Sequence, residues 1–167
     1  METKKILVVD DDVDIQTMLT AILKKENYTV INAADKKEAL EILKTETPDL
    51  AILDVMMTTR HEGFELAEAI KSNSELNFPI LMHTSIDVLT TTKPSVQAMA
   101  REFRTDPNNK DLQVILIKDI TTGNAGIDYL AANGETIWLP VDGFVKKPVN
   151  AKNVLPEVAR LLTKEEA

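Results

Sequence analysis

Short apolar runs alternate with segments of helical periodicity along most of this chain, and this alternation restricts the fold more than any other feature. The runs occupy residues 6–9, 29–31, 50–53, 80–82 and 144–145. Near-continuous apolar runs of this length are typical of parallel strands that helices cover on both faces of the sheet. We therefore predict an α/β fold built on a five-stranded parallel sheet.

The segments between the runs predict which helical faces are buried. The first has apolar residues at positions i, i+3, i+4, i+7 and i+8, which places Gln16 on the side that faces water. These residues are Ile15, Met18, Leu19, Ile22 and Leu23. The second helix begins at Asp35, with Glu38 three residues later, the pattern of a capping box. A third helix follows Gly63, and the last apolar stripe covers residues 154–162.

Residues from about 85 to 142 exceed what one crossover between parallel strands requires, which predicts an insertion before the last strand. Within it we expect an amphipathic helix after Pro94-Ser95, a strand over residues 112–117 and a short helix around residues 127–130. Asn133-Gly134 is a hairpin signal, but its flanking runs lie far apart, which leaves the hairpin open. Trp138 either anchors the insertion or is an exposed contact residue.

Composition excludes several classes of protein. The chain of 167 residues has no cysteine, so disulfides and thiolate metal sites are ruled out. No apolar run approaches the roughly 20 residues that span a bilayer. A net charge of −8 has the wrong sign for a general nucleic-acid binder. We expect a single cytoplasmic domain over residues 1–167, with no further domain after the last helix and no direct contact with nucleic acid or membrane.

The ends of the predicted strands carry the residues that could do chemistry. Ligands bind open parallel sheets at the carboxyl ends of their strands, and here these ends bear Asp10-Asp11-Asp12, Asp54, His83-Thr84-Ser85 and Lys146-Lys147. Carboxylates that converge repel each other unless a cation neutralises them, and oxygen ligands favour Mg²⁺. With a lysine and a hydroxyl nearby, a carboxylate can then attack phosphorus.

Four motifs in this order resemble the receiver domains of response regulators, over residues 4–84 and 143–162. The motifs are Ile6-Leu7-Val8-Val9-Asp10-Asp11-Asp12, Leu53-Asp54-Val55-Met56-Met57 followed by Gly63-Phe64-Glu65-Leu66, Pro79-Ile80-Leu81-Met82-His83-Thr84, and Phe144-Val145-Lys146-Lys147-Pro148. The resemblance implies a flavodoxin-like, doubly wound sheet of order 2-1-3-4-5 with helices on both faces, and an insertion between strands 4 and 5 over about 85–142.

The resemblance also implies a role for individual residues. Asp54 corresponds to the phospho-acceptor, and Asp10 and Asp11 to the acid pair that holds Mg²⁺ together with Asp54 and the backbone carbonyl of Met56. Thr84 corresponds to the switch hydroxyl and Phe144 to the switch aromatic residue. Lys147, which precedes the proline, corresponds to the lysine that pairs with the phosphoryl group.

The function implied by the resemblance is a phospho-accepting switch of a bacterial two-component system. A sensor histidine kinase would phosphorylate Asp54, and the change would alter a surface that binds an unknown downstream protein. We expect no enzyme activity beyond Mg²⁺-assisted self-phosphorylation and autodephosphorylation. The sequence departs from the family pattern in the loop over residues 58–62, which is about one residue longer, and in the insertion.

Several alternatives remain beside this interpretation. Asp10-Asp11-Asp12 alone would suit a helix N-terminus. His61 and His83 are isolated in the sequence, so we expect solvated or half-buried histidines without a role. An aspartyl phosphatase normally needs a second acid two residues after its nucleophile, where this chain has Met56. The main alternative is a degenerate receiver that acts as a phosphorylation-independent protein-interaction module.

Overall fold

The computed structural model describes residues 3–55 and 62–166, apart from the side chains of residues 164–166. The chain divides into two compact units. One unit combines Met1–Ser85 with Val145–Ala167, and the other consists of Ile86–Phe144. The boundaries of the second unit lie within two residues of those predicted for the insertion, about 85–142.

The first unit contains four strands and the second half of a fifth in a sheet of order β2-β1-β3-β4-β9. Its strands are β1 (Lys5–Val9), β2 (Thr29–Ala33), β3 (Leu50–Asp54), β4 (Ile80–Thr84) and β9 (Gly143–Lys146). The β1–β2, β1–β3 and β3–β4 pairs are parallel. This arrangement confirms the predicted order, with β9 as the fifth strand of the sheet.

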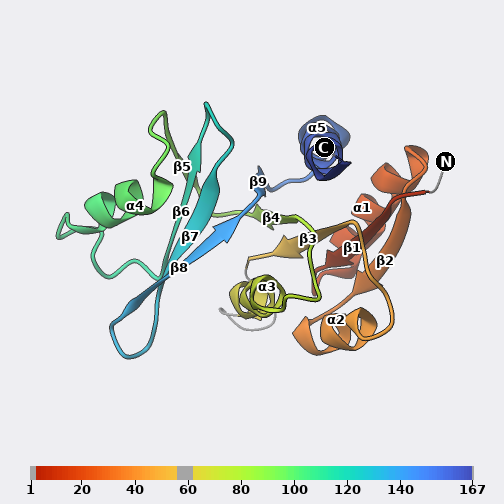
Figure 1. Cartoon of the computed structure of the whole chain (residues 1–167), viewed down its shortest axis with the longest axis horizontal. Helices are drawn as coiled ribbons and strands as arrows, with labels where there is room; N and C mark the ends of the chain where they lie inside the picture. The colour runs from red at the N-terminus through yellow and green to blue at the C-terminus, as the bar shows by residue number, and fades with distance from the viewer. Residues whose placement is uncertain (1–2, 56–61, 167) are drawn as a thin grey trace. The chain divides into compact units, whose positions relative to one another are not determined.

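Helices cover both faces of this sheet. They are α1 (Val13–Lys25), α2 (Lys36–Leu43), α3 (Glu62–Ser72) and α5 (Ala151–Glu166). Helices α1 and α5 lie on one face and α2 and α3 on the other (Figure 1). Asp35 caps α2 as predicted, since its side chain accepts from the Glu38 amide at 2.8 Å. Met18 departs from the predicted apolar stripe of α1 and is 44% exposed.

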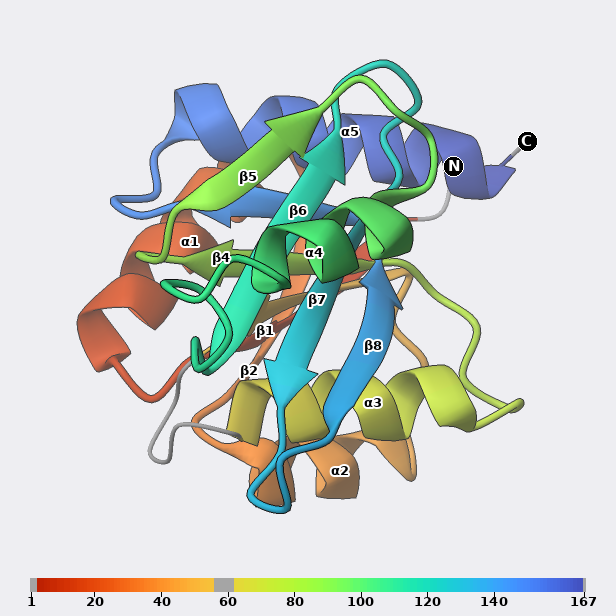
Figure 2. The ribbon, with the colours of Figure 1, turned by 90° about the vertical axis from the view of Figure 1, so that its left-hand side faces the viewer.

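The second unit is a βαβ element extended by a hairpin. It contains β5 (Val88–Thr91), α4 (Val96–Arg104), β6 (Val114–Asp119), β7 (Ala125–Leu130) and β8 (Thr136–Val141). The sheet order is β5-β6-β7-β8, in which β5 and β6 are parallel and the remaining pairs antiparallel. Helix α4 packs on β6 and β7 (Figure 2). The unit therefore has a small core of its own beneath α4.

The structure decides several points that the insertion's sequence left open. The helix after Pro94-Ser95 and the strand over 112–117 are confirmed as α4 and β6, but the short helix expected around 127–130 is wrong, because β7 occupies those residues. The Asn133-Gly134 turn does join a hairpin, and Gly134 has a φ of +89° that favours glycine. Trp138 packs against the core under α4, so it anchors the unit.

A buried ion pair joins α4 to β7 in the second unit. The Arg104 side chain is 10% exposed and that of Asp128 is 4% exposed, and Nη2 of Arg104 lies 2.7 Å from Oδ1 of Asp128. Arg104 also donates from Nη1 to the backbone carbonyls of Leu112 at 2.7 Å and Lys110 at 3.1 Å. The guanidinium thereby ties the helix to the strand and to the segment between α4 and β6.

Among the described residues, no helix combines the length and the apolar character that a membrane span requires.

Candidate functional site

The carboxyl ends of the parallel strands place the predicted residues at one edge of the first unit's sheet. Asp10 directly follows β1, Asp54 ends β3, Thr84 ends β4 and Lys147 directly follows β9. The backbone sets this arrangement, since Asp54 pairs in register with His83. The amide of Lys147 donates to the carbonyl of Thr84 at 2.7 Å. Residues that lie up to 137 positions apart in the chain therefore meet at neighbouring strand ends.

Three carboxylates and one ammonium group form the centre of this edge. Asp10, Asp11 and Asp54 each offer an oxygen, and these oxygens all lie within 4.8 Å of one another. Asp10 and Asp54 are buried and Asp11 is exposed. Nζ of Lys147 lies 3.0 Å from Oδ2 of Asp54 and 3.8 Å from Oδ2 of Asp10. The cluster thus consists of Asp54, which contacts Lys147, and of Asp10 and Asp11 beside it.

The electrostatics of the cluster favour a bound cation. Burial raises the pKa of the Asp10 carboxyl from 3.8 to about 6, and the charges of Asp54 and Asp11 add to the rise. The hydrogen bond from the Asp12 amide and the charge of Lys147 act in the opposite direction but are smaller than the effect of burial. One lysine therefore leaves the negative charge of Asp10 only partly compensated.

The donor set of the cluster fits Mg²⁺. This ion prefers oxygen ligands at about 2.0–2.1 Å, so opposite ligands of its shell lie roughly 4.2 Å apart. Three carboxylate oxygens within 4.8 Å of one another are close to that spacing. Asp10, Asp11 and Asp54 are the described residues that would hold the ion. Met56, the predicted source of a carbonyl ligand, lies outside the described residues, as does His61.

The acidic run at the start of α1 divides between two uses. Asp12 is the N-cap of α1, and its side chain accepts from the Asp14 amide at 2.9 Å. Asp10 Oδ1 accepts from the Asp12 amide at 2.8 Å, which fixes one oxygen of that carboxylate. The helix-terminus interpretation therefore applies to Asp12, whereas Asp10 and Asp11 belong to the acid cluster.

The prediction that His83 is solvated or half-buried is wrong. Its side chain is 0% exposed, and Nε2 lies 3.1 Å from Oδ2 of Asp10. Burial, together with the nearby charge of Lys147, lowers the pKa of His83 to about 3, so the imidazole is neutral. Among the described residues, neither ring nitrogen of His83 nor Oδ2 of Asp10 has a hydrogen-bond partner. One feature of the sequence could have indicated this burial, namely a titratable residue that directly follows the apolar run Ile80-Leu81-Met82 within the strand.

Gln16 also departs from its predicted place on the solvent side of α1. Its Nε2 donates to the carbonyl of Asp10 at 2.5 Å and to the carbonyl of Ala33 at 3.2 Å. These carbonyls follow β1 and end β2, so the side chain ties two strand ends together next to the acid cluster. The amphipathic pattern did not reveal this role, because a glutamine that bonds to backbone carbonyls has the same polarity as one that faces water.

The two remaining predicted residues are both buried. Thr84 is 1% exposed at the end of β4, and Phe144 is 7% exposed within β9. Strands β4 and β9 are neighbours in the sheet order. The roles of a switch hydroxyl and a switch aromatic residue stay predictions.

Gly63 lies so close to the end of β3 that no side chain fits there. A Cβ atom at this position would overlap the backbone carbonyl groups of Asp54 and Val55. Gly63→Ala should therefore lower the free energy of unfolding by about 1–3 kcal/mol through overpacking. Urea denaturation followed by circular dichroism measures the change. An increase in stability, the usual effect of replacing glycine with alanine inside a helix, would contradict the close approach.

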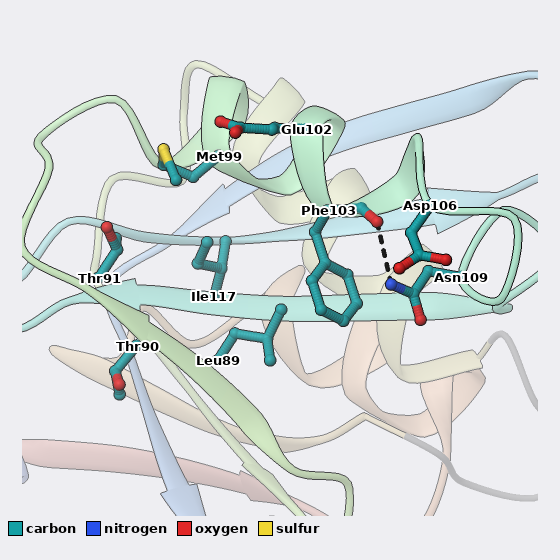
Figure 3. A pocket seen from close by; sticks show the side chains of 9 residues that line it. All are labelled: Leu89, Thr90, Thr91, Met99, Glu102, Phe103, Asp106, Asn109 and Ile117. Carbon is teal, nitrogen blue, oxygen red and sulfur yellow. Dashed lines mark hydrogen bonds between the residues drawn. The ribbon is translucent and has the colours of Figure 1, made fainter.

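A groove of about 410 Å³ lies in the second unit between β5, β6 and α4. Figure 3 shows the apolar side chains of Leu89, Phe103 and Ile117 around a common space. The lining also includes Thr90, Thr91, Met99, Glu102, Asp106 and Asn109. Glu102 and Asp106 are exposed carboxylates on the lining, and none of the described residues that line it is basic. The groove suits an apolar group better than an anion.

Comparison with known proteins bears on both the fold and the site. The model of the response regulator receiver domain matches residues 6–118, more than half of the chain. The "Probable transcriptional regulator ycf27" of Cyanophora paradoxa is 31% identical over 160 residues, which are 95% of this chain and 64% of that protein. The "Alkaline phosphatase synthesis transcriptional regulatory protein PhoP" of Bacillus subtilis (strain 168) is 46% identical over 84 residues, which are 50% of this chain and 34% of that protein. The chain thus spans less than two thirds of the length of these curated relatives.

Solved structures agree with the fold. A response regulator receiver domain protein (CheY-like) from Methanospirillum hungatei JF-1 superposes with a TM-score of 0.60 at 23% identity, covering 99% of this chain and 98% of that one. The chemotaxis protein CheY4 of Vibrio cholerae gives a TM-score of 0.59 at 25% identity, covering 96% and 99%. The match to the family model ends before Phe144-Val145-Lys146-Lys147-Pro148, and β9 supplies the last strand of the sheet.

Proposed function

The chain belongs to the response regulator receiver family, and on this premise we propose that it is a signalling switch whose Asp54 accepts a phosphoryl group from a sensor histidine kinase. The observation that carries the proposal is the constellation around Asp54. The carboxylate is buried at the end of β3, Lys147 lies 3.0 Å from it, and two further acids offer oxygens within 4.8 Å. A carboxylate whose only role was to stabilise a turn would need neither Lys147 nor the two further acids beside it.

The proposed transfer is a displacement at phosphorus. An oxygen of Asp54 forms the new bond while the P–N bond of the donor phosphohistidine breaks and the donor imidazole keeps the electron pair. Asp10, Asp11 and Asp54 would hold Mg²⁺, which when bound neutralises charge on the phosphoryl oxygens. Lys147, already beside Asp54, contributes a second positive charge from the chain itself. Attack by water on the same acyl phosphate would return Asp54 to its free form.

The phosphoryl group would act as the switch through its charge of nearly −2. Lys147 would form an ion pair with the phosphoryl group, since it already contacts the acceptor carboxylate. Thr84, buried at the end of β4, would donate its hydroxyl to a phosphoryl oxygen, and Phe144 would take its inward position as the surface changes. Such changes bias a surface between two states, and a downstream protein would recognise one of them.

The proposal extends to the setting of the protein. We place it in the cytoplasm of a bacterium, with a histidine kinase as phosphodonor and Mg²⁺ as cofactor. It would be a component of a phosphorelay and would have no enzyme activity other than self-phosphorylation and autodephosphorylation. The net charge of −8 supports the absence of direct nucleic-acid binding.

Intact-mass measurement with acetyl phosphate tests the proposal. The wild-type protein should gain the mass of one phosphoryl group in the presence of Mg²⁺ and none in EDTA. Asp54→Asn should not gain it, because the amide is not a nucleophile, whereas Asp111→Asn, a change at an exposed acid, should gain it like the wild type. Labelling of Asp54→Asn would place the acceptor elsewhere.

A second candidate function is a protein-interaction module that works without phosphorylation. The observation that favours it is the second unit, which has its own sheet, helix and core within the chain of a receiver. In this case acetyl phosphate would give no mass gain on the wild type even at high concentration. The groove of the second unit would then be the first surface to examine.

A further inference from the structure

The buried histidine beside the acid cluster, His83, has no part in the proposed transfer. The presence of a polar side chain at this buried position therefore needs an explanation. His83 lies in β4, where its neighbours Leu81 and Met82 are apolar and fully buried. An apolar residue of similar volume would fill the position without loss, since a buried polar group without a hydrogen bond costs about 1–3 kcal/mol. Buried polar groups in proteins nearly always have partners, so an exception calls for an explanation.

The atom that faces His83 is an oxygen of a predicted cation ligand. Nε2 of His83 and Oδ2 of Asp10 lie 3.1 Å apart, a distance within the range of N–H···O hydrogen bonds, although the contact does not satisfy hydrogen-bond geometry. The ring torsion of histidine is broad, so rotation of the ring toward a hydrogen-bonding geometry costs little torsional energy. An imidazole carries at least one N–H in either protonation state, so His83 has a proton to donate.

The other contacts of Asp10 leave this role to His83. Oδ1 is fixed by the Asp12 amide at 2.8 Å. Lys147 lies nearer to Asp54, at 3.0 Å, than to Asp10, at 3.8 Å, so it is the partner of the phospho-acceptor first. A carboxylate has about four lone-pair sites, and donors from Asp12 and His83 would leave two for a cation.

We propose that His83 is a positioning residue for the cation site, which donates from Nε2 to Oδ2 of Asp10 and so fixes the direction in which this carboxylate presents its free lone pairs. The inference rests on the proposed function, because it assumes that Asp10 holds Mg²⁺. Groups that hydrogen-bond to metal ligands orient them, and the loss of such a group typically weakens metal binding about 10–100-fold.

Two substitutions at His83 separate this role from packing. His83→Leu keeps the volume and removes the donor, so it should weaken Mg²⁺ binding by about 10–100-fold while the melting temperature of the metal-free protein stays equal or rises. His83→Gln keeps an N–H donor and should restore most of the affinity. Isothermal titration calorimetry with MgCl₂ at pH 8 gives the dissociation constants directly. Met82→Leu in the same strand is the matched packing control and should bind Mg²⁺ like the wild type.

The outcomes distinguish the inference from its premise. Mg²⁺ binding by His83→Leu at wild-type affinity would overturn the positioning role and leave the proposed function intact. A loss of affinity accompanied by a lower melting temperature, without rescue by His83→Gln, would make His83 a structural residue and also overturn the inference. Failure of the wild type to bind Mg²⁺ would overturn the proposed function and the inference together.

Discussion

Asp10→Asn will raise the free energy of unfolding of the metal-free protein by about 3 kcal/mol at pH 8. Burial raises the pKa of Asp10 to about 6 in the folded protein, whereas the unfolded chain has the ordinary value of 3.8. The two values differ by about 2 units, and each unit corresponds to about 1.4 kcal/mol. Asparagine has nearly the same shape as aspartate but carries no charge, so the substitution removes the penalty for a buried charge.

The effect has a defined pH window. Between pH 4 and 6 the folded wild type binds more protons at Asp10 than the unfolded chain does, so its stability falls as the pH rises. Below about pH 4 Asp10 is neutral in both states and the advantage of Asp10→Asn disappears. Above about pH 6 the folded wild type also carries the charge, and the advantage is complete.

Urea denaturation in EDTA at several pH values between 4 and 8 measures this window. Asp111→Asn is the matched control, because Asp111 is an exposed acid outside the cluster and its removal should change stability by less than about 0.5 kcal/mol. Saturating Mg²⁺ should stabilise the wild type, by about 2.7 kcal/mol at 100 times the dissociation constant, but not Asp10→Asn. Equal stability of the two proteins in EDTA at pH 8 would contradict the electrostatic account.

Arg104→Met will lower the free energy of unfolding of the second unit by about 3–5 kcal/mol. The substitution leaves the buried carboxylate of Asp128 without the cation that lies 2.7 Å away, and an unpaired buried charge is costly. It also removes the donor to the carbonyls of Leu112 and Lys110. The double substitution Arg104→Met, Asp128→Leu removes both charges and should recover most of the lost stability.

Trp138 provides a local signal for this experiment. It is the single tryptophan of the chain and packs against the core of the second unit, so its fluorescence during urea denaturation follows that unit. Arg101→Met is the matched control, because Arg101 is exposed on the same helix and should change stability by less than about 0.5 kcal/mol. If the single and double variants were equally destabilised, the loss would come from packing and not from the unpaired charge.

The candidate site was predictable where it depends on strand ends. Asp10 and Asp54 directly follow short apolar runs, and Thr84 and Lys147 are the second residues after such runs. Parallel strands bring their carboxyl ends to one edge of a sheet. The positions of these four residues follow from the chain's order of runs alone. The structure places all four at that edge. Their chemical roles stay predictions.

The site was not predictable where it depends on contacts through the sheet or across helices. His83 and Gln16 have the same identity in the sequence whether they face water or the acid cluster. Gln16 contacts Asp10 because α1 packs against β1. His83 contacts Asp10 because β4 lies two strands away from β1 in the same sheet. Gly63 is a similar case, since only the packed structure brings its Cα against the carbonyl of Asp54.

Within the insertion, local pattern was sufficient for α4 and β6 but not for β7. Val96 to Arg104 has a clear helical period after Pro94, and the run that becomes β6 is dense in β-branched residues. Residues 125–130 contain a glycine and an aspartate and have no strong period of either kind. Their strand conformation comes from hydrogen bonds to β6 and β8 on both sides, and from the pairing of Asp128 with Arg104.

The resemblance to receiver domains supplied the strand order, and the sequence by itself determined the parallel α/β core, the length of the insertion and the residues at the strand ends. These properties are encoded locally, in the period of apolar residues and in the polar residues that interrupt it. Only the tertiary structure decided the second sheet, the burial of His83 beside Asp10, the contacts of Gln16 and the ion pair between Arg104 and Asp128. Each of these depends on which distant segments lie side by side, and that choice is made by packing and pairing of the whole chain rather than by any short stretch of residues.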